Sequence, residues 1–309
     1  MIAELREDRS RGQERLESAA PRAGTSFPAV GRWVAPAPGP GMKILHHEII
    51  GHGPAAGWLY VLHGVFGAGR NWGTVARSLT RVRPDWGVVL VDLREHGASR
   101  GFPPPHTVSA AARDLAGLAV ATGLRSRALL GHSFGGKVAL SRAADGPEGL
   151  EQVWVIDSTP EAAPPAGSAW RMLQAVKRLP DRFASREPLI RSLEADGFEP
   201  AVAQWMATNL ERADGGFRWR FERGAVESLI RDFFATDLWP VVEALPASIE
   251  IRFVKATASA VLSAAAVARI RDASQRARVR LDELAGGHWL NADNPEGLVE
   301  LLRRGLPAA

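Results

Sequence analysis

The sequence contains no cysteine among its 309 residues, which excludes disulfide bonds and thiolate metal sites. It also lacks an uninterrupted apolar run near the roughly 18 residues that a transmembrane helix requires, so no integral membrane segment is expected. The N-terminal region has no apolar stretch of the kind that directs secretion. These absences predict a cytoplasmic protein with no metal centre, and no feature of the sequence predicts an oligomeric state.

A concentrated basic surface is missing as well, although the formal net charge is +4. The basic residues are mostly arginines scattered along the chain, which argues against a nucleic-acid partner. Apolar residues make up 46% and charged residues 23% of the sequence, the proportions of a globular protein with a sizeable core. A chain of this length fits one large domain that carries an insertion.

Residues 1–41 differ in composition from the rest and show neither helical nor strand periodicity. They end in a run of proline, alanine and glycine, so a flexible N-terminal tail is predicted. Acidic residues throughout the tail argue against a transit peptide. An alternative expectation places the native start at Met42, which N-terminal sequencing of the native protein would test.

From Met42 onward, short apolar runs alternate with helical patterns. Strands are predicted at residues 44–50, 58–62, 86–93, 128–130, 153–156, 249–254 and 279–281. Helices are predicted at residues 72–81, 108–122, 134–144, 263–272 and 295–303. This alternation predicts an α/β fold with a mostly parallel central sheet flanked by helices on both faces.

One long insertion interrupts the alternation. Residues 159–246 show helical stretches without strand alternation, which predicts a helical cap over the carboxyl edge of the sheet, where open α/β folds bind ligands. The core is then formed by residues 42–158 and 247–309. The insertion carries four tryptophans, which individually suit helix packing and together suggest the roof of an apolar pocket: Trp170, Trp205, Trp219 and Trp239.

The candidate nucleophile is Ser133, in the pattern Gly131-x-Ser133-x-Gly135 between a predicted strand and a predicted helix. A serine on so sharp a turn has a strained backbone, and the flanking glycines leave room where a Cβ would collide. The simpler interpretation is a glycine-rich turn. The strand before it and the helix after it favour a nucleophile elbow.

A serine hydroxyl needs a general base, because it is a weak nucleophile at neutral pH. His288 follows the last predicted strand on a glycine-rich loop and precedes the last predicted helix. In folds with a nucleophile elbow, the nucleophile comes first in the sequence and the catalytic histidine comes last. His288 is therefore the predicted base.

A catalytic triad also needs a carboxylate that orients the histidine. In this sequence its position is inferred by elimination. The usual place is the loop after strand 249–254, but no acid occurs between Glu250 and Asp272. One strand earlier, Asp157 ends the strand 153–156. From there it can orient His288 and stabilise its imidazolium form; the alternative is that Asp157 only caps the start of the insertion.

Two backbone amides are expected to face the negative charge that develops on the substrate. The first is the N–H of Phe134, directly after the nucleophile, and the second is the N–H of Val65, in a loop after an early strand. His63 and His132 are expected to be structural. The stretch from Asp92 to Ser99 is expected to form a structural loop, with His96 near the edge of the pocket.

Together these motifs resemble the α/β-hydrolase superfamily. The resemblance lies in four stretches, namely His63-Gly64-Val65-Phe66-Gly67, Val91-Asp92-Leu93-Arg94-x-His96-Gly97-x-Ser99, Gly131-His132-Ser133-x-Gly135-Gly136-Lys137 and Ile156-Asp157-x-x-Pro160. More narrowly they are similar to the YbfF-type esterase and abhydrolase-domain-containing protein 11 group. In that group the acid after the sixth strand completes the triad, which the resemblance carries to Asp157. It also implies no cofactor.

The expected function is hydrolysis of a small-molecule acyl ester or thioester through Ser133, His288, Asp157 and an acyl-enzyme intermediate. Two alternatives keep the same fold: C–C bond hydrolysis and cofactor-free haloperoxidase chemistry. A further alternative is a non-catalytic receptor that uses the pocket for small molecules. Dehalogenases and epoxide hydrolases are disfavoured because they need aspartate at the position of Ser133.

Overall fold

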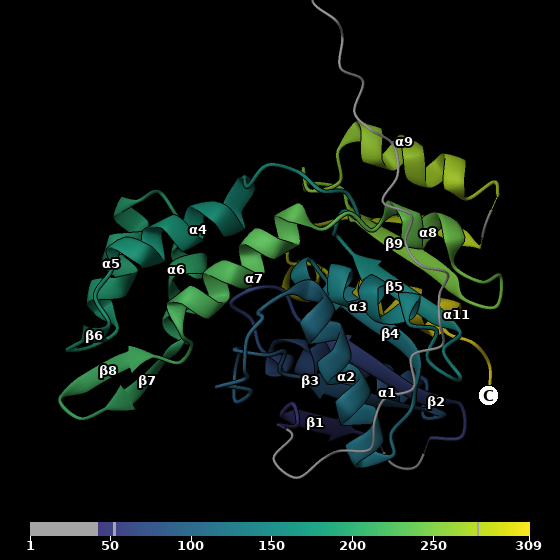
Figure 1. Cartoon of the computed structure of the whole chain (residues 1–309), viewed down its shortest axis with the longest axis horizontal. Coiled ribbons are helices and arrows are strands. Elements are labelled where there is room, and N and C mark those ends of the chain that lie inside the picture. Colours follow the sequence, from purple (N-terminus) through teal and green to yellow (C-terminus); the bar gives the residue numbers. More distant parts are fainter. Residues whose placement is uncertain (1–42, 52–53, 277) are drawn as a thin grey trace, which may run out of the picture. The chain divides into compact units, whose positions relative to one another are not determined.

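The computed structural model describes residues 43–309 apart from positions 52, 53 and 277. The predicted tail, residues 1–41, lies outside the described residues. Figure 1 shows the described part as a cartoon and labels its helices and strands where there is room.

A seven-stranded sheet forms the centre of the fold. Its strands are β1 (His47–Ile50), β2 (Gly57–Leu62), β3 (Trp86–Val91), β4 (Ser126–His132), β5 (Gln152–Ile156), β9 (Glu250–Ala256) and β10 (Val279–Leu284). They lie in the order β1-β3-β2-β4-β5-β9-β10, and β1 is antiparallel to β3 while the other neighbours are parallel. The predicted α/β fold with a mostly parallel sheet is confirmed, and each predicted strand matches one of these seven.

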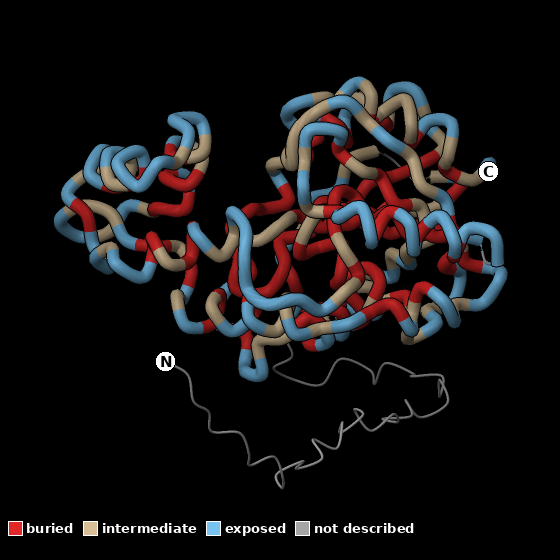
Figure 2. Tube along the Cα trace, turned by 90° about the horizontal axis from the view of Figure 1, so that it is seen from above, coloured by how far each residue is buried: buried red, intermediate tan, exposed pale blue. Residues whose placement is uncertain are grey.

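Helices cover both faces of the sheet, because its strands are apolar on both sides. Along β5, Val153 and Val155 pack into one buried cluster while Trp154 and Ile156 pack into another, as the alternation of side chains along a strand requires. Figure 2 shows these buried segments in red. The first cluster includes residues of α2 (Val108–Thr122), α3 (Phe134–Ala144), α8 (Trp239–Ala244) and α9 (Ala264–Ala273). The second includes residues of α1 (Gly73–Val82), α10 (Leu290–Asp293) and α11 (Pro295–Gly305).

The insertion between β5 and β9 forms a cap with its own buried cluster. Its helices are α4 (Gly167–Arg178), α5 (Glu187–Ala195), α6 (Pro200–Ala207) and α7 (Arg223–Ala235). Helices predominate in this segment. It also contains three short antiparallel strands that were not expected from the sequence: β6 (Arg182–Phe183), β7 (Leu210–Ala213) and β8 (Gly216–Trp219). These strands span two to four residues each, too few for an alternating pattern to stand out.

The two chain segments that connect core and cap lie side by side. The amide of Leu238 donates to the carbonyl of Pro160 at 2.8 Å, and the amide of Ala163 donates to the carbonyl of Phe234 at 2.9 Å. The cap is therefore attached to the core through a paired connection rather than through two independent linkers.

Lys137 of α3 holds both connecting segments through hydrogen bonds to their backbone. Its side chain is buried, and its Nζ donates to the carbonyl oxygens of Glu161 at 2.8 Å, Phe233 at 2.6 Å and Thr236 at 2.7 Å. The Nζ also lies 4.5 Å from the centre of the Phe233 ring. Burial lowers the pKa of Lys137 to about 8. One ammonium group thus ties both connections to the helix that follows Ser133.

Replacing Lys137 with methionine is expected to lower the free energy of unfolding by about 2–4 kcal/mol, because three buried carbonyl groups lose their donor. Urea-induced unfolding followed by tryptophan fluorescence measures this change. The control is Lys177→Met at the cap surface, where Lys177 pairs with Glu227 and where a loss below about 1 kcal/mol is expected. Equal losses in the two variants would contradict the anchoring role of Lys137.

Candidate active site

The turn between β4 and α3 holds Ser133 in a strained backbone conformation. Its φ is 51° and its ψ is −115°, a combination that non-glycine residues rarely adopt. The turn closes so tightly that a Cβ at Gly131 would overlap the carbonyl group of Gly135. A Cβ at Gly135 would lie 2.5 Å from the carbonyl oxygen of Leu62, at the end of β2. Both glycines of the predicted elbow are therefore required by close backbone contacts.

The neighbouring strand β5 braces the same turn. The amide of Ser133 donates to the carbonyl of Ile156 at 3.1 Å, and the hydroxyl of Ser158 donates to the carbonyl of Ser133 at 2.7 Å. A Cβ at Gly136 would lie 2.7 Å from the Cβ of Ser158. These contacts hold the end of β5, and with it Asp157, next to the turn.

Asp157 is fully buried at the carboxyl end of β5 and faces His288. The Nδ1 atom of His288 lies 2.7 Å from Oδ2 of Asp157, and the amide of Ala256 donates to Oδ1 at 3.2 Å. Asp157 has a φ of 42°, so its backbone also turns sharply where the strand ends. The structure thus brings together two of the predicted site residues that are 131 positions apart in the sequence.

The surroundings of Asp157 favour its ionised form. Burial alone opposes ionisation, but hydrogen bonds from His288 and Ser259, the charge of His288 and the amide of Ala256 together hold the pKa of Asp157 below its ordinary value. A carboxylate in this state accepts a hydrogen bond from the N–H at Nδ1 of His288, which leaves Nε2 unprotonated and able to accept a proton.

The loop after β9 supports this carboxylate instead of supplying one. The amide of Ala256 donates to Asp157, and the side chain of Ser259 contributes to the lowered pKa of that carboxylate. The Nζ of Lys255 donates to the carbonyl oxygens of Ala256 at 3.0 Å and Ser259 at 3.2 Å, which fixes the shape of the loop. No pattern in the sequence singles out Ser259, because serines are common in loops and Asp157 lies on another strand.

His132 fixes the loop that carries His288. Its ring Nε2 lies 2.7 Å from the carbonyl oxygen of His288, and the centres of the two rings are 4.6 Å apart. Burial, together with repulsion from His288, lowers the pKa of His132 to about 3. His132 is therefore neutral and donates from Nε2. The ring of His132 is buried, as a structural role requires. Its hydrogen bond also ties the backbone of His288, the predicted base, to the residue that directly precedes Ser133.

The loop after β2 is arranged around His63. Its Nδ1 donates to the carbonyl of Gly64 at 2.7 Å, and its Nε2 accepts from the amide of Leu93 at 3.0 Å. Burial lowers the pKa of His63, in keeping with this neutral form. In the described part of the chain neither the amide of Val65 nor that of Phe134 has a hydrogen-bond partner. Both amides are therefore available to a ligand.

The Asp92–Ser99 stretch forms a structural loop, in agreement with the sequence. Asp92 accepts from the amides of Gly69 and Ala98, while Arg94 pairs with Asp114 at 2.6 Å. The ring of His96 is buried, with its centre 5.1 Å from that of His63.

Aromatic side chains of the cap contact the loops of the site. The ring centres are separated by 5.6 Å in Phe66–Phe221, 5.5 Å in Trp205–Trp289 and 6.2 Å in Phe134–Phe233. Of the four cap tryptophans, Trp205 alone takes part in these ring pairs. Trp239 lies in the core cluster and Trp219 in the cluster of the cap, while Trp170 packs against that cluster. The expectation of a tryptophan roof thus applies to Trp205.

Within residues 43–309, apart from the three positions not described, no group of three or more His, Asp or Glu side chains is arranged to hold a metal ion. In the same part of the chain, no helix combines the length and the apolar character needed to cross a bilayer.

A model of the alpha/beta hydrolase family matches residues 59–301, which span β2 to α11. The chain belongs to the α/β-hydrolase family. The resemblance predicted from the sequence motifs is thereby confirmed.

Named relatives of this α/β hydrolase include esterases and lipases. It is 28% identical over 244 residues to the Mus musculus protein named sn-1-specific diacylglycerol lipase ABHD11, covering 77% of each chain. It is 25% identical over 264 residues to Esterase YbfF of Escherichia coli strain K12, covering 80% of this chain and 91% of that one. A solved structure titled Marine microorganism esterase matches with a TM-score of 0.72 and 24% identity, covering 83% and 97% of the two chains.

The contacts of Asp157 predict how the stability of this α/β hydrolase depends on pH. The variant Asp157→Asn is expected to be less stable than the wild type near neutral pH. The difference should shrink as the pH falls through the lowered pKa of Asp157, because the native contacts favour the ionised form. Urea unfolding at stepwise lower pH measures this difference.

Asp145→Asn, at the far end of α3, controls for the loss of one negative charge. A stability difference for Asp157→Asn that stays constant from about pH 7 to about pH 3 would contradict the assignment of these contacts to the carboxylate.

Proposed function

We propose that this protein is a serine hydrolase that cleaves carboxylic esters or acyl thioesters through Ser133, His288 and Asp157. The observation that carries the proposal is the 2.7 Å hydrogen bond between Asp157 and His288, next to a serine in a strained elbow. Esterase and lipase names among the relatives support the same reaction class.

Each residue has a role that follows from its contacts. Asp157 holds the proton on Nδ1 of His288, so that Nε2 takes the proton of the Ser133 hydroxyl as the oxygen attacks the acyl carbonyl. The charge that appears on His288 is stabilised by the buried carboxylate. His288 then returns the proton to the leaving alcohol or thiol, which leaves an acyl group on Ser133.

The amides of Val65 and Phe134 are proposed to bind the oxyanion of the tetrahedral intermediate. Phe134 is the first residue of α3, where the helix leaves amides without an internal partner and carries a partial positive charge. Val65 belongs to the loop held by His63. Water activated by the same His288 then hydrolyses the acyl-enzyme, and this sequence of steps needs no cofactor.

The acyl group is proposed to lie under the cap, among the rings that meet the site loops. Phe233, Phe221 and Trp205 present aromatic surface there, which favours apolar acyl chains over charged ones.

Replacing Ser133 with alanine is expected to lower the turnover of p-nitrophenyl esters by about 10⁴-fold or more, because no nucleophile remains. Initial rates with p-nitrophenyl acetate and butyrate measure this loss. Ser109→Ala, on the exposed face of α2, serves as the matched control and should keep the wild-type rate.

A fluorophosphonate probe separates this proposal from a non-catalytic receptor. Wild-type protein should be labelled and Ser133→Ala should not, since labelling requires an activated serine. A folded wild-type protein that resists labelling, or a Ser133→Ala variant with undiminished turnover, would refute the serine mechanism.

Replacing Asp157 with asparagine is expected to lower kcat by about 10⁴-fold, because the imidazole of His288 then favours the wrong tautomer. Steady-state kinetics on the same esters measure the change, with Asp145→Asn as a control that should retain activity. A loss of only a few-fold would mean that Asp157 acts as a cap for the insertion and not on His288.

A further inference from the structure

A small pocket of about 130 Å³ lies where the cap meets the core, outside the candidate active site. Its core side includes Ala68, Gly69 and Arg70, which directly follow the loop that carries Val65. Its cap side is formed by Arg220, which directly follows β8. The pocket is therefore bounded by one arginine from each part of the fold.

Arginines crowd around the cap side of this pocket. The charges of Arg70, Arg100 and Arg186 all act on the guanidinium of Arg220, with Glu211 opposing them. Burial, followed by the charge of Arg70, lowers the pKa of Arg220. Like charges that act on one another repel, and an anion bound between them relieves that repulsion.

Glu211, the acid that acts on Arg220, forms ion pairs with two other arginines. The Oε1 atom of Glu211 lies 2.8 Å from Nη1 of Arg100 and 3.0 Å from Nε of Arg218. Among the described residues, Nε of Arg220 is buried without a hydrogen-bond partner, and no carboxylate forms an ion pair with Arg70 or Arg220. A buried donor without an acceptor costs stability unless a ligand or water satisfies it.

Two acids line the pocket without pairing with these arginines. Asp92 accepts from the amide of Gly69 at 2.7 Å and the amide of Ala98 at 2.9 Å, and it faces Nδ1 of His46 at 3.0 Å. Both carboxylate oxygens of Asp92 therefore already have hydrogen-bond partners in the core. Glu48 is exposed on the edge strand β1, where water screens its charge.

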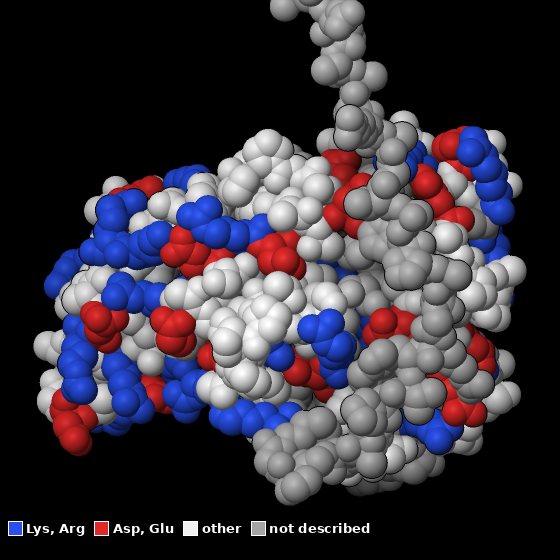
Figure 3. Space-filling model, viewed as in Figure 1, with Lys and Arg blue, Asp and Glu red and all other residues white. Residues whose placement is uncertain are grey.

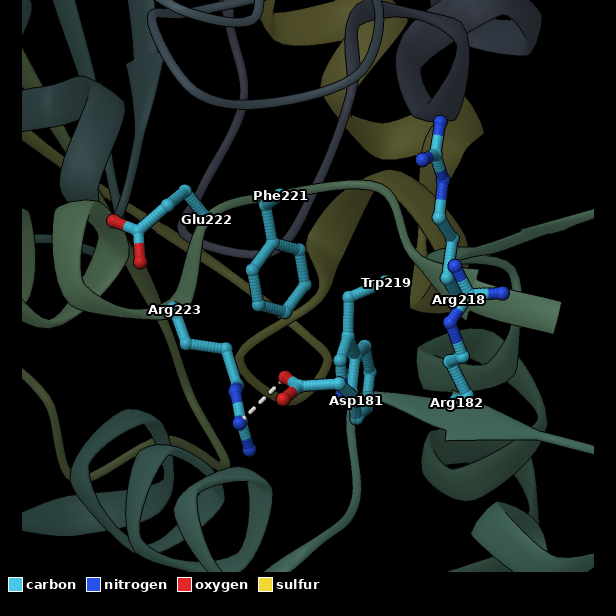
Figure 4. A pocket seen from close by; sticks show the side chains of 7 residues that line it. All are labelled: Asp181, Arg182, Arg218, Trp219, Phe221, Glu222 and Arg223. Atoms are coloured by element: carbon cyan, nitrogen blue, oxygen red, sulfur yellow. Dashed lines mark ion pairs between the residues drawn. The ribbon is translucent and has the colours of Figure 1, made fainter. Parts of the chain in front are cut away.

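A larger cavity within the cap provides a contrast. It measures about 440 Å³ and is also lined by arginines, two of which pair with acids: Arg218 with Glu211, and Arg223 with Asp181, toward which it points, as the dashed line in Figure 4 marks. Figure 3 likewise shows many basic side chains over the cap with acidic ones interspersed. Arg70 and Arg220 differ from Arg218 and Arg223 because, among the described residues, neither forms an ion pair with a carboxylate.

We propose that the pocket between Arg70 and Arg220 binds an oxyanion of the phosphate type. Guanidinium groups bind phosphate oxygens with two parallel hydrogen bonds and keep their charge at any ordinary pH. The two arginines come from opposite sides of the junction, so the anion bridges cap and core beside the loop of Val65. The anion is either free phosphate or a phosphate group carried by the substrate.

Isothermal titration of the full-length protein with inorganic phosphate, at constant ionic strength, tests the proposal without relying on catalysis. Wild-type protein should bind phosphate saturably. Arg70→Gln and Arg220→Gln should each weaken binding by about 10-fold or more, since each removes a charge-assisted contact. Circular dichroism and thermal melting in phosphate-free buffer establish that both variants are folded.

Arg212→Gln is the matched control, because Arg212 is an exposed arginine on the same hairpin that does not line the pocket. It should bind phosphate as the wild type does. Absence of saturable binding by the wild type would overturn the proposal, and so would equal weakening in all three variants. Arg70 is exposed, so its variant keeps the test valid even if Arg220→Gln fails to fold.

A second measurement distinguishes free phosphate from a phosphate group of the substrate. It rests on the proposed thioester hydrolysis. It compares kcat/KM for acetyl-coenzyme A and for S-acetyl-N-acetylcysteamine, which share the acyl group and differ in phosphates. A preference for the first that Arg70→Gln removes assigns the pocket to the substrate. Equal rates, together with saturable phosphate binding, assign it to the free anion. Failure to hydrolyse either thioester bears on the proposed function and leaves the titration unaffected.

Discussion

The close approach of backbones around Ser133 is the constraint on which the rest of the site depends. Gly131 and Gly135 leave no room for a side chain, so the chain turns from β4 into α3 within a few residues and Ser133 is forced to a positive φ. The same approach brings α3 against the end of β2. As a result the loop of Val65 and the first amide of α3 come to lie on one side of the serine, and β5 lies on the other.

Support for His288, the proposed base, comes from several parts of the fold at once. Asp157 holds the ring of His288, while His132 holds its backbone carbonyl. The loop after β9 holds Asp157 through Ala256 and is itself held by Lys255. The loop after β9 contains no acid of its own. It supports the proposed acid, Asp157, which comes from the neighbouring strand β5.

Much of this arrangement could be predicted from the sequence, because the signals are local. The apolar runs gave all seven strands of the main sheet, and the helices at residues 108–122 and 134–144 match α2 and α3 at both ends. Ser133 is marked by adjacent glycines. Asp157 is predicted by elimination, since the loop after β9 contains no acid, and its hydrogen bond to His288 supports the role that we propose for it.

What the sequence could not predict depends on contacts between distant segments. The hydrogen bonds of His132 and Lys137 reach backbone carbonyls, which every residue carries, so no pattern in the sequence singles out their partners. The strands β6 to β8 were missed because they are short and rich in arginine. The crowding around Arg220 arises only when the hairpin of β7 and β8 meets the loop after β2.

The position of Asp157 on β5 has a consequence for the order in which the protein is made. Ser133 and Asp157 leave the ribosome close together, before any part of the cap, whereas His288 follows Asp157 by 131 positions. In the proposed mechanism a nascent chain that stops short of His288 has its nucleophile and its carboxylate but no base. Hydrolytic activity would begin only after His288 has been synthesised, and by then the whole cap has been synthesised as well.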